Sequence, residues 1–193
     1  MTAPDRPFVT IVSGLPRSGT SLMMRMLEAG GLPVLVDNLR AADVDNPRGY
    51  YEFEPVKRLK DDAGWVARAA GRAVKMVYLL LLDLPPGHRY RVLFMRRNLD
   101  EVLASQKAML DRLGKSSPLD DERMAALFRD QIARFESWVQ GRPEFRVLDV
   151  SYNAMVTDPA PLAAEVDRFL GGGLDLAAMA GVVDPTLYRN RAT

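Results

Sequence analysis

The sequence lacks several features that define common protein classes. No cysteine occurs among its 193 residues, and His88 is the single histidine. The lack of cysteine excludes disulfides, thiol catalysis and cysteine-ligated metals, and it fits a reducing compartment. An excess of one charge is also missing, because 26 Lys and Arg oppose 25 Asp and Glu for a net charge of +1. We therefore expect no nucleic-acid partner, and any anion site must be local.

Long hydrophobic runs are missing too. The longest, residues 76–82, is far shorter than the roughly 20 residues that a membrane span needs. The opening MTAPDRPF leads into a predicted core strand without the basic and then apolar pattern of a leader. We expect a cytoplasmic protein with no membrane span.

The length and composition favour one domain covering residues 1–193. With 48% hydrophobic and 26% charged residues, the chain can bury one core but is short for two. Strand-like and helix-like segments alternate along it, which predicts a parallel sheet with helices on both faces. The predicted strands lie at 8–13, 32–36, 73–79, 91–95 and 145–150, and the predicted helices at 19–29, from Pro55, after Asn98, at 118–140 and at 159–170.

The most informative stretch is the loop GLPRSGTS at residues 14–21, between the first predicted strand and helix. Backbone N–H groups converge in such a loop, and the helix dipole adds partial positive charge, so we expect a bound phosphate or sulfate. The stretch matches the nucleotide-binding pattern G-x-x-x-x-G-K-[ST] except that Thr20 replaces the lysine. The missing lysine weakens a nucleoside-triphosphate interpretation.

Two motifs together resemble a known family. PRSGTS after a strand resembles the 5′-phosphosulfate loop of sulfotransferases that use 3′-phosphoadenosine 5′-phosphosulfate (PAPS). MRRNLDEVLAS is similar to the family's 3′-phosphate element, in which an arginine at a strand end precedes a serine by eight positions, as Arg97 precedes Ser105. A softer similarity covers residues 146–171, where Tyr152-Asn153 replaces the family's frequent Tyr-Glu, and we assign that turn no catalytic role.

The resemblance implies a three-layer α/β/α, P-loop NTPase-like sulfotransferase fold with a central parallel sheet. It also implies PAPS as co-substrate, with no metal required. The PAPS-binding residues that it predicts are Pro16, Arg17, Ser18, Gly19, Thr20, Ser21, Arg97 and Ser105, with Arg17 also in a catalytic role. The tail residues Tyr188, Arg189 and Arg191 are expected to close over the 3′-phosphate or adenine, or else to form a solvated terminus.

The base is predicted from NPRGYYEFE, which resembles an Asn-Pro-x-Gly-Tyr-x-Glu stretch of bacterial family members. It makes Glu52 the leading general base and Glu54 the reserve. Partial burial among aromatic neighbours would raise the pKa of such a carboxyl toward neutrality. The alternative is a solvated loop carboxylate. His88 precedes a strand, at the wrong end of the sheet for catalysis.

Lys75 stands within an apolar predicted strand, where a lysine costs several kcal/mol unless it reaches an anion or water. The resemblance implies that it stabilises the leaving phosphate. The alternative is a strand-edge lysine that extends to solvent.

These residues predict a sulfotransferase that moves a sulfuryl group from PAPS to an acceptor hydroxyl. Two alternatives stay open, a small-molecule kinase using ATP and Mg²⁺ and a catalytically silent nucleotide-binding protein of the same fold. The acceptor pocket is expected from residues 37–54 and 110–125, whose composition suits phenols, alcohols, sugars or peptides. The sequence favours no oligomeric state.

Overall fold

A parallel five-stranded sheet forms the centre of the structure, a computed structural model that describes residues 7–37, 39 and 49–184. The strand order is β2-β3-β1-β4-β5, and every pair runs parallel. The first strand of the chain is thus central, flanked by strands far from it in sequence. The strands are β1 (Val9–Gly14), β2 (Val34–Leu35), β3 (Ala73–Lys75), β4 (Tyr90–Arg96) and β5 (Phe145–Ser151).

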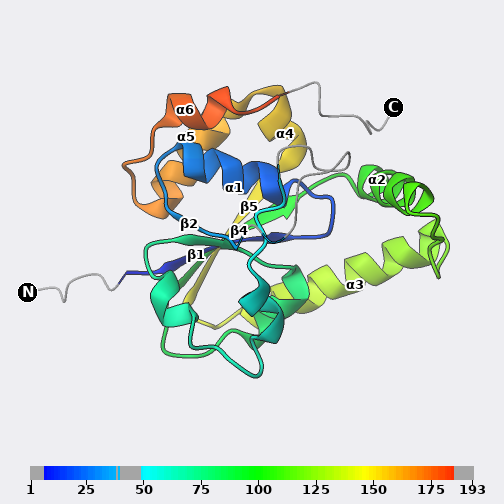
Figure 1. The fold of residues 1–193 in the computed structure, drawn as a ribbon, viewed down its shortest axis with the longest axis horizontal. Helices are drawn as coiled ribbons and strands as arrows, with labels where there is room; N and C mark the ends of the chain where they lie inside the picture. The colour runs from blue at the N-terminus through cyan, green and yellow to red at the C-terminus, as the bar shows by residue number, and fades with distance from the viewer. Residues whose placement is uncertain (1–6, 38, 40–48, 185–193) are drawn as a thin grey trace, which may run out of the picture.

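Helices cover both faces of the sheet (Figure 1). One face carries α1 (Thr20–Ala29), α4 (Tyr152–Thr157), α5 (Pro159–Leu170) and α6 (Leu176–Gly181). The other carries α2 (Leu99–Arg112), α3 (Asp121–Val139) and the 3₁₀ helices η1 (Glu54–Arg58), η2 (Val66–Ala69) and η3 (Tyr78–Asp83). Adjacent strand residues serve opposite cores, because Ile11 packs with the α3 side and Val12 with the α1 side. The expected three-layer α/β/α fold is confirmed.

The strand register brings the carboxyl ends of the central strands together. Val12 pairs with Lys75, and Gly14 pairs with Met95. The loop after β1 therefore lies beside the last residue of β3 and the residues that follow β4. Open parallel α/β sheets bind ligands outside the carboxyl ends of their strands, where the loops that lead into the following helices come together.

Some predicted elements differ from the observed ones. The helix expected from Pro55 is only the 3₁₀ helix η1, and the strand expected at 73–79 ends at Lys75. The apolar run that follows forms η3, which buries Tyr78 and Leu81 in the core as a strand would have done. A short apolar run fits either element, so its tertiary contacts decide.

Two further boundaries were also displaced. The strand expected at 32–36 contains only Val34–Leu35. The helix expected from residue 118 begins at Asp121, because the Asp120 side chain accepts a hydrogen bond from Arg123 N at 2.8 Å and caps it there.

Within the described part of the chain, no helix combines the length and the apolar character required to cross a lipid bilayer.

Candidate active site

The loop between β1 and α1 is held in a closed shape by its own residues. The buried Ser18 hydroxyl donates to Leu15 O at 2.7 Å. Gly19 has φ 96°, and a Cβ there would lie 2.3 Å from a carbon of the Tyr152 ring. Only glycine satisfies both restrictions, so the loop depends on Gly19. The backbone amides that follow open the N-terminus of α1, as an anion cradle requires.

Arg17 connects this loop to α2. Its Nε donates to Ser105 Oγ at 3.0 Å, and its carbonyl oxygen accepts from Arg97 at 2.9 Å. Its backbone has φ 68°, an uncommon conformation for a residue with a side chain. Arg17, predicted to bind the phosphosulfate, is therefore in direct contact with Ser105 and with Arg97, both predicted to bind the 3′-phosphate.

Arg97 directly follows β4, and only 7% of its side chain is exposed. Its Nε pairs with Glu101 at 2.9 Å, and its guanidinium carbon lies 4.4 Å from the centre of the Tyr152 ring. Glu101 is 3% exposed and accepts from Asn153 Nδ2 at 3.1 and 3.2 Å through its two oxygens. The guanidinium is thus fixed along one edge and across one face.

Lys75 points into the same site from the end of β3. Its ammonium donates to Tyr50 O, and it lies 3.5 Å from Ser21 Oγ, which itself donates to Tyr50 O at 3.3 Å. Because β3 lies between β2 and β1, Lys75 is not on an edge strand. The structure brings Lys75 to the loop at 14–21.

Glu52 lies two residues after Tyr50, whose carbonyl oxygen accepts the hydrogen bond from Lys75. The Glu52 side chain is 22% exposed, and its carboxylate lies 3.9 Å from Lys57 Nζ. Glu54 is more exposed, at 42%, and pairs with the same lysine at the start of η1. Of the two candidate bases, Glu52 is the more enclosed and lies nearer in sequence to the Lys75 contact at Tyr50.

Asp37 holds the segment that carries Glu52 through two hydrogen bonds. Asp37 N donates to Glu52 O at 3.1 Å, and Asp37 Oδ2 accepts from Glu54 N at 2.5 Å. The Glu54 hydrogen bond lowers the pKa of Asp37, since it favours the ionised carboxylate. Asp37 therefore holds the backbone on both sides of Phe53, through its main-chain N–H at Glu52 and through its carboxylate at Glu54.

Tyr51, next to Glu52, is a hydrogen-bond donor. Its hydroxyl donates to Glu28 Oε2 at 2.6 Å. Burial, with the hydrogen bond and charge of Glu28, raises the pKa of Tyr51 to about 12. Tyr51 stays protonated at neutral pH, so it is a poor candidate for the base.

The remaining predicted residues fall into two groups. His88 precedes β4 and so lies at the amino-terminal end of the strands, opposite the site, as expected for a turn histidine. Tyr188, Arg189 and Arg191 lie outside the described residues, as does the 46–48 portion of the motif before Glu52.

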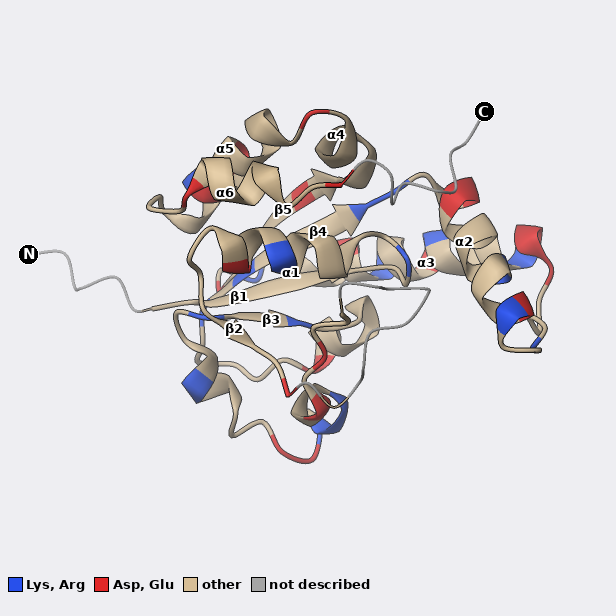
Figure 2. Cartoon of the chain, turned by 45° about the horizontal axis from the view of Figure 1, so that its top comes forward, with Lys and Arg blue, Asp and Glu red and all other residues tan. Residues whose placement is uncertain are grey.

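The charge distribution is mixed. Figure 2 shows Lys and Arg interspersed with Asp and Glu over both helical layers, including the hairpin of α2 and α3. The positive groups of the site are therefore local, as the net charge predicted. Across residues 7–37, 39 and 49–184, no three His, Asp or Glu side chains are grouped to hold a metal ion.

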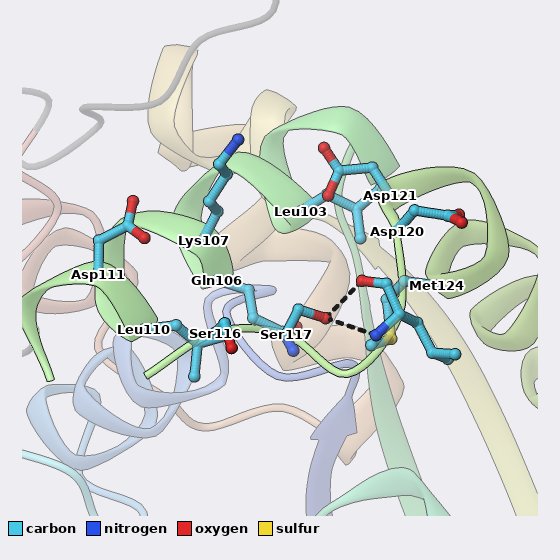
Figure 3. A pocket seen from close by; sticks show the side chains of 11 residues that line it. Leu103, Gln106, Lys107, Leu110, Asp111, Ser116, Ser117, Asp120, Asp121 and Met124 are labelled. Atoms are coloured by element: carbon cyan, nitrogen blue, oxygen red, sulfur yellow. Dashed lines mark hydrogen bonds between the residues drawn. The ribbon is translucent and has the colours of Figure 1, made fainter. Parts of the chain in front are cut away.

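A pocket of about 350 Å³ lies between α2 and α3 and is lined by leucine and methionine side chains together with polar and charged ones (Figure 3). Gln106, the neighbour of Ser105, contributes a buried Oε1 with no hydrogen-bond partner. The Ser117 hydroxyl bonds to Leu119 O at 2.7 Å and so shapes the opposite wall. The lining residues are Leu103, Gln106, Lys107, Leu110, Asp111, Ser116, Ser117, Leu119, Asp120, Asp121 and Met124.

Sequence reasoning missed the contacts that support Arg97. Glu101 lies in the first turn of the helix that was expected after Asn98, and Asn98 caps this helix because its Oδ1 accepts from Asp100 N at 2.8 Å. The spacing of four between Arg97 and Glu101 was the available signal for their ion pair. No sequence signal connects either residue to Asn153.

Comparison with solved structures identifies the fold. The chain is similar to the sulfotransferase domain from the curacin biosynthetic pathway (TM-score 0.53, 18% identity, 95% of this chain and 90% of that one). It is also similar to the sulfotransferase domain from the Synechococcus PCC 7002 olefin synthase (TM-score 0.54, 15% identity, 100% and 91%). A third match is mouse sulfotransferase SULT7A1 complexed with PAP, the desulfated product of PAPS (TM-score 0.61, 16% identity, 100% and 70%).

These similarities define a sulfotransferase fold, which confirms the resemblance found in the sequence at the level of structure. No family model matches the chain, and no curated protein matches it either.

Proposed function

We propose that the protein is a PAPS-dependent sulfotransferase that transfers a sulfuryl group to an acceptor hydroxyl. The observation that carries this proposal is the contact of Arg17 with both Ser105 and Arg97. A donor with phosphate at both its 5′ and 3′ positions needs two anion-binding elements close together, and this contact joins two such elements. The similarity to sulfotransferases, one of them complexed with PAP, supports the same donor.

Each residue has a role that its position supports. Glu52 accepts the proton of the acceptor hydroxyl as the acceptor oxygen bonds to sulfur, and the bond from sulfur to the bridging phosphate oxygen breaks. Lys75, beside Ser21, stabilises the charge on the departing phosphate, and Arg17 binds the phosphosulfate. Most of the rate gain comes from positioning and charge stabilisation, as in phosphoryl transfer.

The acceptor would occupy the pocket between α2 and α3. That pocket is lined in part by α2, the helix that carries Ser105, and combines apolar with polar side chains. Such a lining suits a hydroxyl compound with an apolar body. Residues 40–48, which were expected to contribute, lie outside the described part of the chain.

The direct test measures binding and transfer separately. PAP at about a hundredfold its Kd should stabilise the protein by about 2.7 kcal/mol, which raises the Tm of a chain of this length by about 5–10 °C. Transfer is then measured with ³⁵S-labelled PAPS against a panel of phenols, alcohols, sugars and peptides.

The outcomes separate the candidate functions. Stabilisation by PAP together with labelled product supports the proposal. Stabilisation by PAP with no product from any acceptor indicates the silent nucleotide-binding protein. Stabilisation by ATP and Mg²⁺ but not by PAP indicates the kinase and overturns the proposal.

A further inference from the structure

The environment of Arg97 contains a buried carboxylate that the proposed reaction does not use. Glu101 is 3% exposed, and the burial of a carboxylate is costly unless partners compensate for it. Its partners are Arg97 Nε at 2.9 Å and Asn153 Nδ2 at 3.1 and 3.2 Å. A carboxylate so near a phosphate-binding arginine would repel the phosphate, so its presence calls for a compensating role.

We propose that Glu101, held by Asn153, is a positioning residue that fixes the Arg97 guanidinium for a 3′-phosphate and so sets the preference for 3′-phosphorylated nucleotides. This inference rests on the proposed function, because it assumes that Arg97 binds that phosphate.

Three contacts together fix the guanidinium. Glu101 holds Nε, the Arg17 carbonyl holds one terminal nitrogen at 2.9 Å, and the Tyr152 ring lies 4.4 Å from the central carbon. An arginine binds phosphate through paired N–H groups in one plane, so its orientation determines whether both bonds form. An arginine that is already fixed also loses less side-chain entropy on binding.

Asn153 supports Glu101 from outside α2. It belongs to α4, and its Oδ1 accepts from Asn98 N at 3.4 Å while its Nδ2 contacts Glu101. Both ends of one amide thus connect α4 to the first turn of α2. Asn153, to whose turn the sequence analysis assigned no catalytic role, thus supports the position of Glu101.

The test is Glu101→Gln, because two explanations predict opposite signs. If Glu101 acted only as a charge, its removal would tighten binding of the bisphosphate. If it positions Arg97, the variant loses about tenfold in affinity for PAP, since the new amide N–H₂ faces the Asn153 N–H₂. Affinity for adenosine 5′-monophosphate, which has no 3′-phosphate, should stay within about twofold of wild type.

Asp100→Asn is the matched control, because Asp100 is an exposed carboxylate on the same turn of α2. It removes the same charge without touching Arg97 and should leave the ratio of the two affinities unchanged. The pair Glu101→Gln and Asn153→Asp restores a donor facing an acceptor and should recover PAP affinity to within about threefold of wild type. Asn153→Ala gives a milder version of the loss if Glu101→Gln folds poorly.

The outcomes distinguish this inference from the function on which it rests. If wild type binds PAP no better than adenosine 5′-monophosphate, the proposed function fails and takes this inference with it. If wild type prefers PAP and the Glu101 and Asn153 variants keep that preference, only the positioning role is overturned. Equal losses for both nucleotides would also overturn it, since they indicate a merely structural role.

Discussion

Arg17 and Ser105 are 88 positions apart in the sequence, yet the arginine Nε lies 3.0 Å from the serine hydroxyl. The contact joins the loop after β1 to the helix after β4. It depends on the pairing of these two strands, in which Gly14 lies opposite Met95. A single bound nucleotide can therefore touch both elements.

Arg97→Ala should weaken PAP binding by about a hundredfold or more, because truncation of a buried, paired charge costs several kcal/mol. Binding of nucleotides without a 3′-phosphate should change far less. The control is Arg96→Ala, since Arg96 instead pairs with Asp149 and Glu136. Titration calorimetry with PAP and adenosine 5′-monophosphate measures the effect, and equal losses for both ligands would contradict the assignment.

Glu52→Gln should lower kcat by about 10²–10⁴-fold, the usual contribution of a general base, with PAP affinity nearly unchanged. Glu54→Gln is the control and should retain turnover, because Glu54 is the more exposed and pairs with Lys57. Both are measured with labelled PAPS at saturating acceptor. The reverse ranking of the two variants would make Glu54 the base.

Lys75→Met should lower kcat by about a hundredfold or more through lost stabilisation of the leaving phosphate. Lys75→Arg should retain part of the rate, because it keeps the charge with a different shape. Lys60→Met serves as the control, since Lys60 is exposed and pairs only weakly with Asp83 at 3.6 Å. An unchanged kcat in Lys75→Met would remove the lysine from the mechanism.

Gly19→Ala should destabilise the fold by about 2–4 kcal/mol, because it adds a clash with Tyr152 to the strain of a positive φ. Gly31→Ala has the same strain at φ 92° but meets no atom within 4 Å, so it isolates the strain alone. Urea unfolding of both variants gives the difference. Equal losses would show that the Tyr152 ring moves aside at little cost.

Asp37→Asn should reduce thermal stability at neutral pH and loosen the segment that carries Glu52. The folded-state pKa of Asp37 lies below its ordinary value, so its stabilisation is full above about pH 4 and is lost as pH falls through the lowered pKa. The Tm difference between wild type and variant should accordingly shrink at pH 3. A difference that stays constant from pH 7 to pH 3 would mean that the charge of Asp37 is not the cause.

The sequence by itself determined the local features of the protein. The strand and glycine-rich loop at 8–21 and the cap at Asn98 follow from short-range chemistry, as does the end of α5 at Gly171, which has φ 101°. The spacing of Arg97 and Ser105 was visible for the same reason, since both lie on one strand-helix unit.

Only the tertiary structure decided how the site is assembled, because the assembly depends on strand order and on contacts between loops at the carboxyl ends of the strands. Placing β1 between β3 and β4 brings Lys75 to Ser21 and Arg97 to Arg17. The same packing made residues 78–83 a 3₁₀ helix, although their apolar sequence suits a strand equally well. It also connected Asn153 to Glu101, two residues 52 positions apart whose contact no local pattern encodes.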